Sequence, residues 1–180
     1  MRHAVFVPPF GELADPIVVA RLAVLAEELG WHGLFVWDHI AYRRVDDVAD
    51  PWITLAAVAC ATREIRLGPM VTPLPRRRPL KVAREVATLD HLSRGRVTLG
   101  VGIAGDPSRE LSGTGEELDA KVRGAMLDEA LEVLEKAWAP GPTIHHGAHY
   151  TVDRLITGPQ PAQTPRPPIW VALRQGNKAP

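Results

Sequence analysis

Apolar runs typical of β-strands recur along this chain at an almost constant interval. They begin near residues 4, 33, 65 and 97, so the intervals are 29, 32 and 32 residues. An interval of about 30 residues is what a strand, a helix and their connecting loops require. A strand joined through a helix to a second strand of the same direction forms a right-handed parallel unit. The repeat therefore predicts a βαβαβα series, and with it an α/β fold with a parallel sheet.

The stretch Glu64–Gly105 carries the clearest example of this unit. Its first strand is predicted at Ile65–Met70, and the helix begins at Pro79, because proline is pre-set for the first helical position. Gly95 ends the helix, since glycine tolerates a left-handed backbone, and the strand Val97–Val101 follows. Residues at positions i, i+4 and i+7 give the helix one apolar face, made of Val82, Val86 and Leu89.

The same signals place the other elements. Further strands are predicted at Ala4–Val7, Gly33–Trp37 and Ile169–Leu173, and further helices from Asp15-Pro16, over Pro51–Ala61 and over Glu117–Trp138. The inner face of the first helix is predicted to hold Val18, Leu22, Leu25 and Leu29. The almost wholly apolar helix Pro51–Ala61 is expected at a helix–helix or subunit contact, and a short hairpin is expected at Thr143–Val152.

Length and composition favour one globular domain over residues 1–180, because 180 residues with 46% hydrophobic content build one ordinary core. Lysine plus arginine equals aspartate plus glutamate at 21 each, so no net charge draws the protein to nucleic acid or to a membrane surface. The single cysteine, Cys60, has no partner for an intrachain disulfide, and no secretory signal is evident. We therefore expect a cytoplasmic protein.

Ligands in parallel α/β folds gather at the carboxyl ends of the strands, where loops and helix amino termini converge. Asp38 and His39 directly follow the second predicted strand. A histidine serves as acid or base near neutral pH, and an adjacent carboxylate can orient it. The pair is thus a candidate for catalysis, and the alternative is a strand-end aspartate that caps a turn beside a surface histidine.

The run Gly100–Gly105 matches the pattern G-x-G-x-x-G of dinucleotide-binding folds. That pattern belongs in the first strand–helix turn, whereas here it follows the fourth strand and Asp106-Pro107 breaks the continuation. A dinucleotide site is therefore not favoured. The glycines still allow close approach of the backbone to a flat ring or a phosphate.

Two polar clusters allow more than one interpretation. His145, His146 and His149 suggest a metal site, but no cysteine or carboxylate stands at ligand spacing, so solvated histidines are favoured. The run Arg76–Arg78 precedes a helix amino terminus, where an anion or phosphate is readily bound. A solvated loop, or pairing with acidic residues of a second subunit, would explain the arginines equally well. A nucleic-acid-binding site is not favoured, because the sequence shows neither further interleaved basic residues nor aromatic residues on which bases could stack.

Several segments together resemble the bacterial luciferase-like monooxygenases, also called LLM class flavin-dependent oxidoreductases. They are GWHGLFVWDHI, DPWITLAAVACATREIRLGPMVTPLPRRRPLKVAREVATLDHLSRGRVTLGVG, HHGAHYTV and PPIWVA, which lie within the chain up to about Val171. The resemblance implies a (β/α)8 TIM barrel that binds FMN or the 5-deazaflavin coenzyme (factor 420) at the carboxyl ends of its strands. It also implies hydride transfer or oxygen activation on a small organic substrate.

The resemblance assigns roles to particular positions. Asp38 and His39 match the pair that faces the reactive edge of the ring, with His39 as acid or base. Met70-Val71 matches a bulge that backs the ring and holds a non-prolyl cis peptide in relatives. The remaining implied cofactor contacts are Thr72 near the pyrimidine edge, and Gly102, Ile103 and Gly105 near the ring or the ribityl chain.

The chain also departs from the family pattern. A full barrel has eight strands and typically ~250 residues, whereas about five strands are evident here, so we expect a partial barrel that lacks its second half. Such a sheet exposes an unpaired edge and an apolar concave face, which monomers avoid. A homodimer or a larger assembly is therefore expected, with Pro51–Ala61 and Glu117–Trp138 as candidate contacts.

Two hypotheses follow for function. The first is a shortened flavin- or deazaflavin-dependent oxidoreductase or monooxygenase that acts on an unknown small organic substrate. The second is a non-catalytic relative that keeps the fold core and dimerises, with weak or no cofactor binding. The resemblance favours the first hypothesis, and the absence of three strands favours the second.

Overall fold

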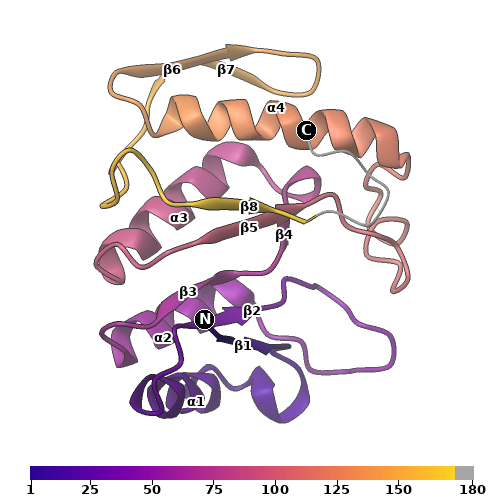
Figure 1. The fold of residues 1–180 in the computed structure, drawn as a ribbon. Coiled ribbons are helices and arrows are strands. Elements are labelled where there is room, and N and C mark those ends of the chain that lie inside the picture. The colour runs from indigo at the N-terminus through magenta and orange to yellow at the C-terminus, as the bar shows by residue number, and fades with distance from the viewer. Residues whose placement is uncertain (173–180) are drawn as a thin grey trace.

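Short parallel strands lie side by side in chain order and form a curved layer, with the helices along its outer side (Figure 1). The structure is a computed structural model that describes residues 1–172. One parallel sheet holds β1 (Ala4–Val7), β2 (Gly33–Val36) and β3 (Arg66–Pro69), and a second holds β4 (Thr72–Pro73), β5 (Leu99–Gly102) and β8 (Ile169–Val171). A parallel bridge between Leu67 and Val97 connects the two. The predicted α/β fold with a parallel sheet is confirmed; Leu173, predicted as strand, lies outside the described residues.

The helices and the hairpin occupy the predicted segments, and α2 has the predicted bounds whereas other ends are shifted. The helices are α1 (Pro16–Glu28), α2 (Pro51–Ala61), α3 (Pro79–Leu92) and α4 (Ala120–Ala137), with 3-10 turns η1 (Gly11–Ala14) and η2 (Leu74–Arg76) and a hairpin of β6 (Pro142–His146) and β7 (Thr151–Ile156). Asp15, Asp50 and Asp119 accept backbone N–H bonds at the starts of α1, α2 and α4. Because Asp119 is the N-cap, α4 begins three residues after the predicted Glu117.

The predicted inner face is right for α3 and wrong for α1. In α3, Val82, Val86 and Leu89 are all buried. In α1, Leu25 is 51% exposed and Leu29 is 68% exposed, and the buried residues are Val19, Ala20, Ala23 and Ala26. Small side chains allow α1 to lie close to α2 and the sheet, so the alanine side faces inward and the larger side chains remain outside.

The apolar helix α2 packs between α1 and α3. Its residues Trp52, Leu55 and Val58 are buried in the core, and Ile53 is the large apolar side chain of this helix that stays exposed. The predicted helix–helix contact is thus made within the chain. Little apolar surface of α2 is left for a second subunit.

Charged side chains secure the connection from α2 to β3. The buried guanidinium of Arg96 donates to the carbonyl oxygens of Ala59, Thr62 and Ile65. Two of these carbonyls lie at the end of α2, where a cation complements the helix dipole. Glu27 accepts three backbone N–H bonds from the residues that lead into β3. Burial alone raises the pKa of Glu27, but these bonds outweigh it and the net pKa lies below the ordinary value.

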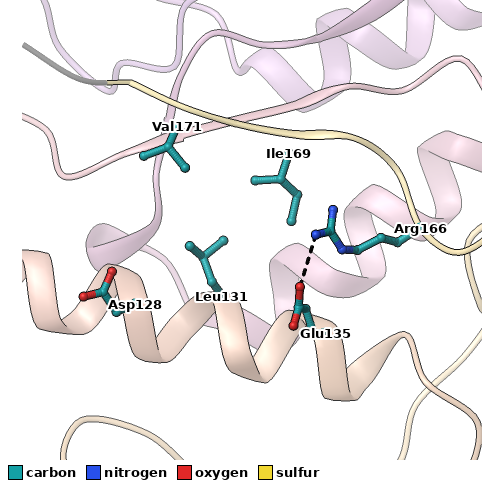
Figure 2. A pocket seen from close by; sticks show the side chains of 6 residues that line it. All are labelled: Asp128, Leu131, Glu135, Arg166, Ile169 and Val171. Carbon is teal, nitrogen blue, oxygen red and sulfur yellow. Dashed lines mark ion pairs between the residues drawn. The ribbon is translucent and has the colours of Figure 1, made fainter. Parts of the chain in front are cut away.

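Two apolar surfaces stay open in the part of the chain that the structure describes. β1 and β8 lie at the outer edges of the sheets, and Phe6 and Trp170 on their inner side are each 51% exposed. A groove of about 450 Å³ runs between α4 and β8, bridged by the ion pair of Arg166 and Glu135 (Figure 2). The expected open edge and apolar inner face are both present. Among the described residues, no helix has the length and apolar character needed to cross a membrane.

Close strand packing makes one glycine of β3 irreplaceable. A Cβ atom on Gly68 would overlap the backbone carbonyl oxygen of Thr98, which cannot move without disturbing the neighbouring strand. We predict that Gly68→Ala lowers the free energy of unfolding in urea by about 2–3 kcal/mol. Gly124→Ala in α4 is the control: its Cβ meets open space, so the same change should raise stability by about 1 kcal/mol. Equal stability of the two variants would contradict the packing seen at Gly68.

Candidate active site

The candidate site forms where β2 ends. The backbone N–H of Trp37 still donates to Val7 in the neighbouring strand, so Asp38 and His39 are the first residues beyond the sheet. The turn η2 brings two arginines to the same edge, and the loop after β5 brings Glu110. Residues from three separate segments therefore meet at the carboxyl end of the strands, as expected for a ligand site in a parallel sheet.

Asp38 is the buried anchor of this site. Arg77 donates to both of its carboxylate oxygens, at 3.0 and 2.7 Å, and Arg76 adds a third bond of 3.0 Å. The hydroxyl of Thr72 donates a fourth at 2.8 Å. The Asp38 side chain has 0% exposure, so no oxygen is open to a ligand in this arrangement. Both Asp38 oxygens therefore face protein donors, and the placement of Asp38 at the reacting edge stays a prediction.

Glu110 is the second buried carboxylate, with a side-chain exposure of 3%. One oxygen, Oε1, accepts bonds from the Ile40 N–H at 2.6 Å, the Arg76 guanidinium at 2.9 Å and the Ala41 N–H at 3.3 Å. The other oxygen, Oε2, lies 2.6 Å from Nδ1 of His39. Arg76 thus links both carboxylates, and its side chain is only 6% exposed.

The charge state of Glu110 defines what His39 presents outward. Burial alone raises the pKa of Glu110, but the bonds from His39, Ile40 and Ala41 outweigh it and hold the pKa below its ordinary value. The carboxylate is therefore ionised near neutral pH and Oε2 only accepts, so a hydrogen bond from a neutral His39 ring to Oε2 requires the proton on Nδ1. Nε2 of His39 has no hydrogen-bond partner among the described residues, and the side chain is 26% exposed. One imidazole nitrogen of the site is thus without a hydrogen-bond partner among residues 1–172.

Aromatic side chains surround the His39 ring. The ring centroids of Tyr42, Trp37 and Phe10 lie 5.1, 5.7 and 5.9 Å from that of the imidazole. These three rings restrict the orientation of the imidazole. The buried Nε1 of Trp37 has no hydrogen-bond partner among residues 1–172, so the site holds an unused donor.

The predicted cofactor-binding residues lie at the same edge of the sheet. The Met70–Val71 peptide is cis, as the family resemblance implies, and both residues are partly exposed between β3 and β4. Thr72 is buried, and its hydroxyl faces Asp38 rather than open space. Thr72 pairs with Val101 in the next strand, which sets the Met70–Val71 turn beside the end of β5.

The glycine-rich segment contributes from β5. Gly102 is buried, and a Cβ atom there would approach Val71 to 3.0 Å, so the two predicted segments touch. Ile103 and Gly105 are partly exposed, and the carbonyl of Ile103 accepts a bond from Arg123 of α4. The structure therefore brings Met70–Thr72 and Gly102–Ile103 together, and Gly105 begins the loop that continues to Glu110.

Sequence reasoning missed Glu110 and left the arginine run open. Arg76 and Arg77 bind Asp38 and Glu110 of the same chain, whereas Arg78 is exposed. Glu110 lies in an irregular polar loop 71 residues after His39, so no spacing in the sequence connects them. The available signal was the arginine run itself, because two cations packed next to a buried strand require buried anions.

The hairpin histidines differ from one another. His145 is buried rather than solvated, because it packs onto α4, where Nε2 lies 3.0 Å from Glu129 and Lys136 donates to Nδ1 at 3.1 Å. His146 and His149 are exposed. Within residues 1–172, no group of three or more histidine, cysteine, aspartate or glutamate side chains is placed to hold a metal ion.

Comparisons with known proteins point in one direction. The model of a family described as luciferase-like monooxygenase matches residues 4–175. The chain is 31% identical over 166 residues to the oxygenase component of a flavin-dependent trigonelline monooxygenase from Acinetobacter baylyi, covering 92% of this chain and 45% of that protein. It is 32% identical to an F420-dependent glucose-6-phosphate dehydrogenase from Amycolatopsis mediterranei, covering 89% and 49%. The chain thus spans about half the length of the curated relatives it matches.

Solved structures give the same picture. Monooxygenase RslO1 from Streptomyces bottropensis superposes with a TM-score of 0.80 at 29% identity, covering 95% of this chain and 53% of that one. An F420-dependent secondary alcohol dehydrogenase, solved with an F420–acetone adduct, gives a TM-score of 0.83 at 26% identity, covering 94% and 51%. The fold is therefore that of these barrel enzymes over about half of their length.

The ion-pair cluster makes a prediction about stability. Replacing Arg76 by Met leaves Asp38 and Glu110 buried with fewer donors, and should lower the free energy of unfolding by about 3 kcal/mol. Arg78→Met is the matched control, because Arg78 is exposed and should change stability by less than about 0.5 kcal/mol. Urea unfolding measures both. Similar values for the two variants would show that the cluster does not stabilise the fold.

Proposed function

Since the chain belongs to the luciferase-like monooxygenase family, we propose that it is an oxidoreductase that uses FMN or the 5-deazaflavin coenzyme to convert a small organic substrate. The observation that carries the proposal is the His39–Glu110 pair. It presents an unpaired imidazole nitrogen at the carboxyl edge of the sheet, between aromatic side chains. A proton-transfer group in an apolar setting is what alcohol, carbonyl or oxygen chemistry requires of the protein.

The residues at this edge fit a flat conjugated ring. It would be held by the partly exposed turn Met70–Val71 and by the segment Gly102–Gly105, because both lie at the ends of neighbouring strands. Gly102 adds no side-chain bulk there. The unused indole N–H of Trp37 is suited to a carbonyl oxygen of such a ring. A bound flavin or deazaflavin supplies the hydride or oxygen chemistry that no side chain provides.

The chain's own residues have separate tasks in this proposal. His39 takes or gives a proton through Nε2 at an oxygen atom of the substrate. Asp38 and the two arginines position the loop that carries His39, and are not themselves the acid or base. Tyr42, together with the other aromatic walls, excludes water, which strengthens the hydrogen bond between His39 and the substrate.

A second candidate function rests on the length of the match. The chain covers 45% and 49% of the trigonelline monooxygenase component and the glucose-6-phosphate dehydrogenase. The alternative is a non-catalytic relative that keeps the fold core, with weak or no cofactor binding.

Cofactor titration separates the two candidates. We expect saturable quenching of coenzyme fluorescence when the protein is added to FMN or, in a separate series, to the 5-deazaflavin coenzyme. The reason is that the Met70–Val71 turn and the Gly102 strand end already stand side by side without a ligand. Absence of saturable binding for both coenzymes would refute the oxidoreductase and support the non-catalytic relative.

His39→Ala serves as the control for the coenzyme that binds. The imidazole is proposed to act in the reaction rather than to hold the ring, so affinity should stay nearly unchanged while turnover falls by about 10²-fold or more. Equal loss of binding and turnover would identify His39 as a structural residue. That result would remove the observation on which the proposal stands.

We further propose that the protein forms a homodimer. The support is the exposed apolar inner side with Phe6 and Trp170, and the groove between α4 and β8 that Figure 2 shows. Apolar surface of this kind is usually covered in solution. Helix α2 is a weaker candidate contact than its composition suggests, because most of it packs within the chain.

Light scattering with two surface variants tests the dimer. The wild-type protein should have twice the chain mass at micromolar concentration, and Trp170→Lys should shift it towards the monomer, because a charge on the inner side opposes burial. Ile53→Lys on α2 changes an apolar residue that is even more exposed, at 64% against 51% for Trp170, and should leave the dimer intact. A wild-type monomer would refute the proposal, and dissociation only by Ile53→Lys would place the contact on α2.

A further inference from the structure

The two oxygens of Glu110 face different kinds of partner. Oε1 receives three donors, namely the backbone N–H groups of Ile40 and Ala41 and the guanidinium of Arg76. Oε2 faces only Nδ1 of His39, at 2.6 Å. The orientation of the carboxylate is therefore set by the backbone and Arg76, independently of the imidazole.

We propose that Glu110 is a positioning residue that fixes the tautomer of His39, with the proton on Nδ1 and the lone pair of Nε2 directed to the substrate. The assignment goes beyond the family match, and its consequence for turnover rests on the proposed function. Glu110 does not touch the substrate in this scheme. It decides whether the outward nitrogen accepts a proton or only donates one.

Three features keep this arrangement in place. Ile40 and Ala41 directly follow His39, so the carboxylate holds the same loop that carries the imidazole. Arg76 binds Glu110 and Asp38 together, which ties that loop to the end of β2. The aromatic walls around the imidazole oppose a ring flip that would exchange Nδ1 and Nε2. The low pKa of Glu110 keeps it an acceptor throughout the neutral range.

The same contacts predict what glutamine does at this position. In Glu110→Gln, the amide oxygen should occupy the Oε1 site, because an NH₂ group there would face three N–H donors. The amide NH₂ then points at His39 and donates to Nδ1. Nδ1 must become an acceptor, and the proton of the neutral ring moves to Nε2. A single isosteric change thus inverts the tautomer without removing volume.

The inversion has a specific kinetic signature. A neutral imidazole with its proton on Nε2 cannot accept a proton from a substrate hydroxyl at that atom. In triad hydrolases, an amide in place of the orienting carboxylate produces the wrong tautomer and a large loss of kcat. We expect Glu110→Gln to lower kcat by about 10²-fold or more, with coenzyme affinity and KM changed little.

Nitrogen NMR of the imidazole rings tests the inference without coenzyme or substrate. Ring nitrogens with and without a proton differ strongly in ¹⁵N chemical shift, and His39→Ala identifies the signals among the seven histidines. At alkaline pH, where the rings are neutral, the wild-type signals should place the proton of His39 on Nδ1. In Glu110→Gln they should place it on Nε2.

Glu129→Gln is the matched control, because Glu129 also pairs with a buried histidine, His145, at 3.0 Å. It should alter the signals of His145 and leave those of His39 unchanged. A wild-type His39 with its proton on Nε2 would overturn the inference, and this measurement stands even where Glu110→Gln does not fold. An unchanged tautomer in folded Glu110→Gln would overturn it as well.

The outcome is separable from that of the proposed function. Coenzyme titration decides whether the chain binds FMN or the deazaflavin, and the NMR shifts decide whether Glu110 sets the tautomer. The predicted tautomers in a protein that binds neither coenzyme would support the inference and refute the oxidoreductase. Coenzyme binding together with a wild-type His39 that carries its proton on Nε2 would support the oxidoreductase and refute the inference.

Discussion

Two carboxylates and two arginines buried at the end of β2 are the interaction on which the rest of the site depends. Asp38 and Glu110 have side-chain exposures of 0% and 3%, and a buried charge is tolerated only when it is paired and hydrogen-bonded. Arg76 and Arg77 meet this requirement with fork-shaped guanidinium groups. The cluster joins the end of β2, the turn before α3 and the loop after β5, so charge pairing rather than apolar contact assembles this edge.

Side-chain exposure rises in order from Asp38 through Arg76 to His39. The Asp38 side chain is fully buried, Arg76 is 6% exposed and His39 is 26% exposed. The buried side chains of Asp38 and Arg76 fix the position of the loop, and the more exposed His39 keeps one imidazole nitrogen without a partner among the described residues. A loop residue such as His39 can therefore be held almost as rigidly as a residue in a strand, because each side chain is fixed by the more deeply buried side chains that it contacts. The aromatic walls complete the site from the other side.

Much of the fold followed from local signals. The strand at Ala4–Val7 and the helix Pro51–Ala61 have the predicted bounds, since a capping aspartate and a following proline define a helix start almost without regard to the rest of the chain. The inner face of α1 was predicted wrongly. Leu25 and Leu29 are the more hydrophobic residues, but the alanine side gives closer packing against α2. Which face of an apolar helix is buried depends on its neighbours.

The sequence by itself determined the parallel α/β architecture and the family, and it predicted a site after β2, β3 and β5. Strand periodicity, caps and loop residues are local, and each can be recognised within one segment. Only the tertiary structure showed that Arg76 and Arg77 bind Asp38 and Glu110, and that both oxygens of Asp38 accept from protein donors. These contacts join residues 34 to 39 positions apart. The free energy of pairing buried charges depends on their distance in space, which no single sequence expresses.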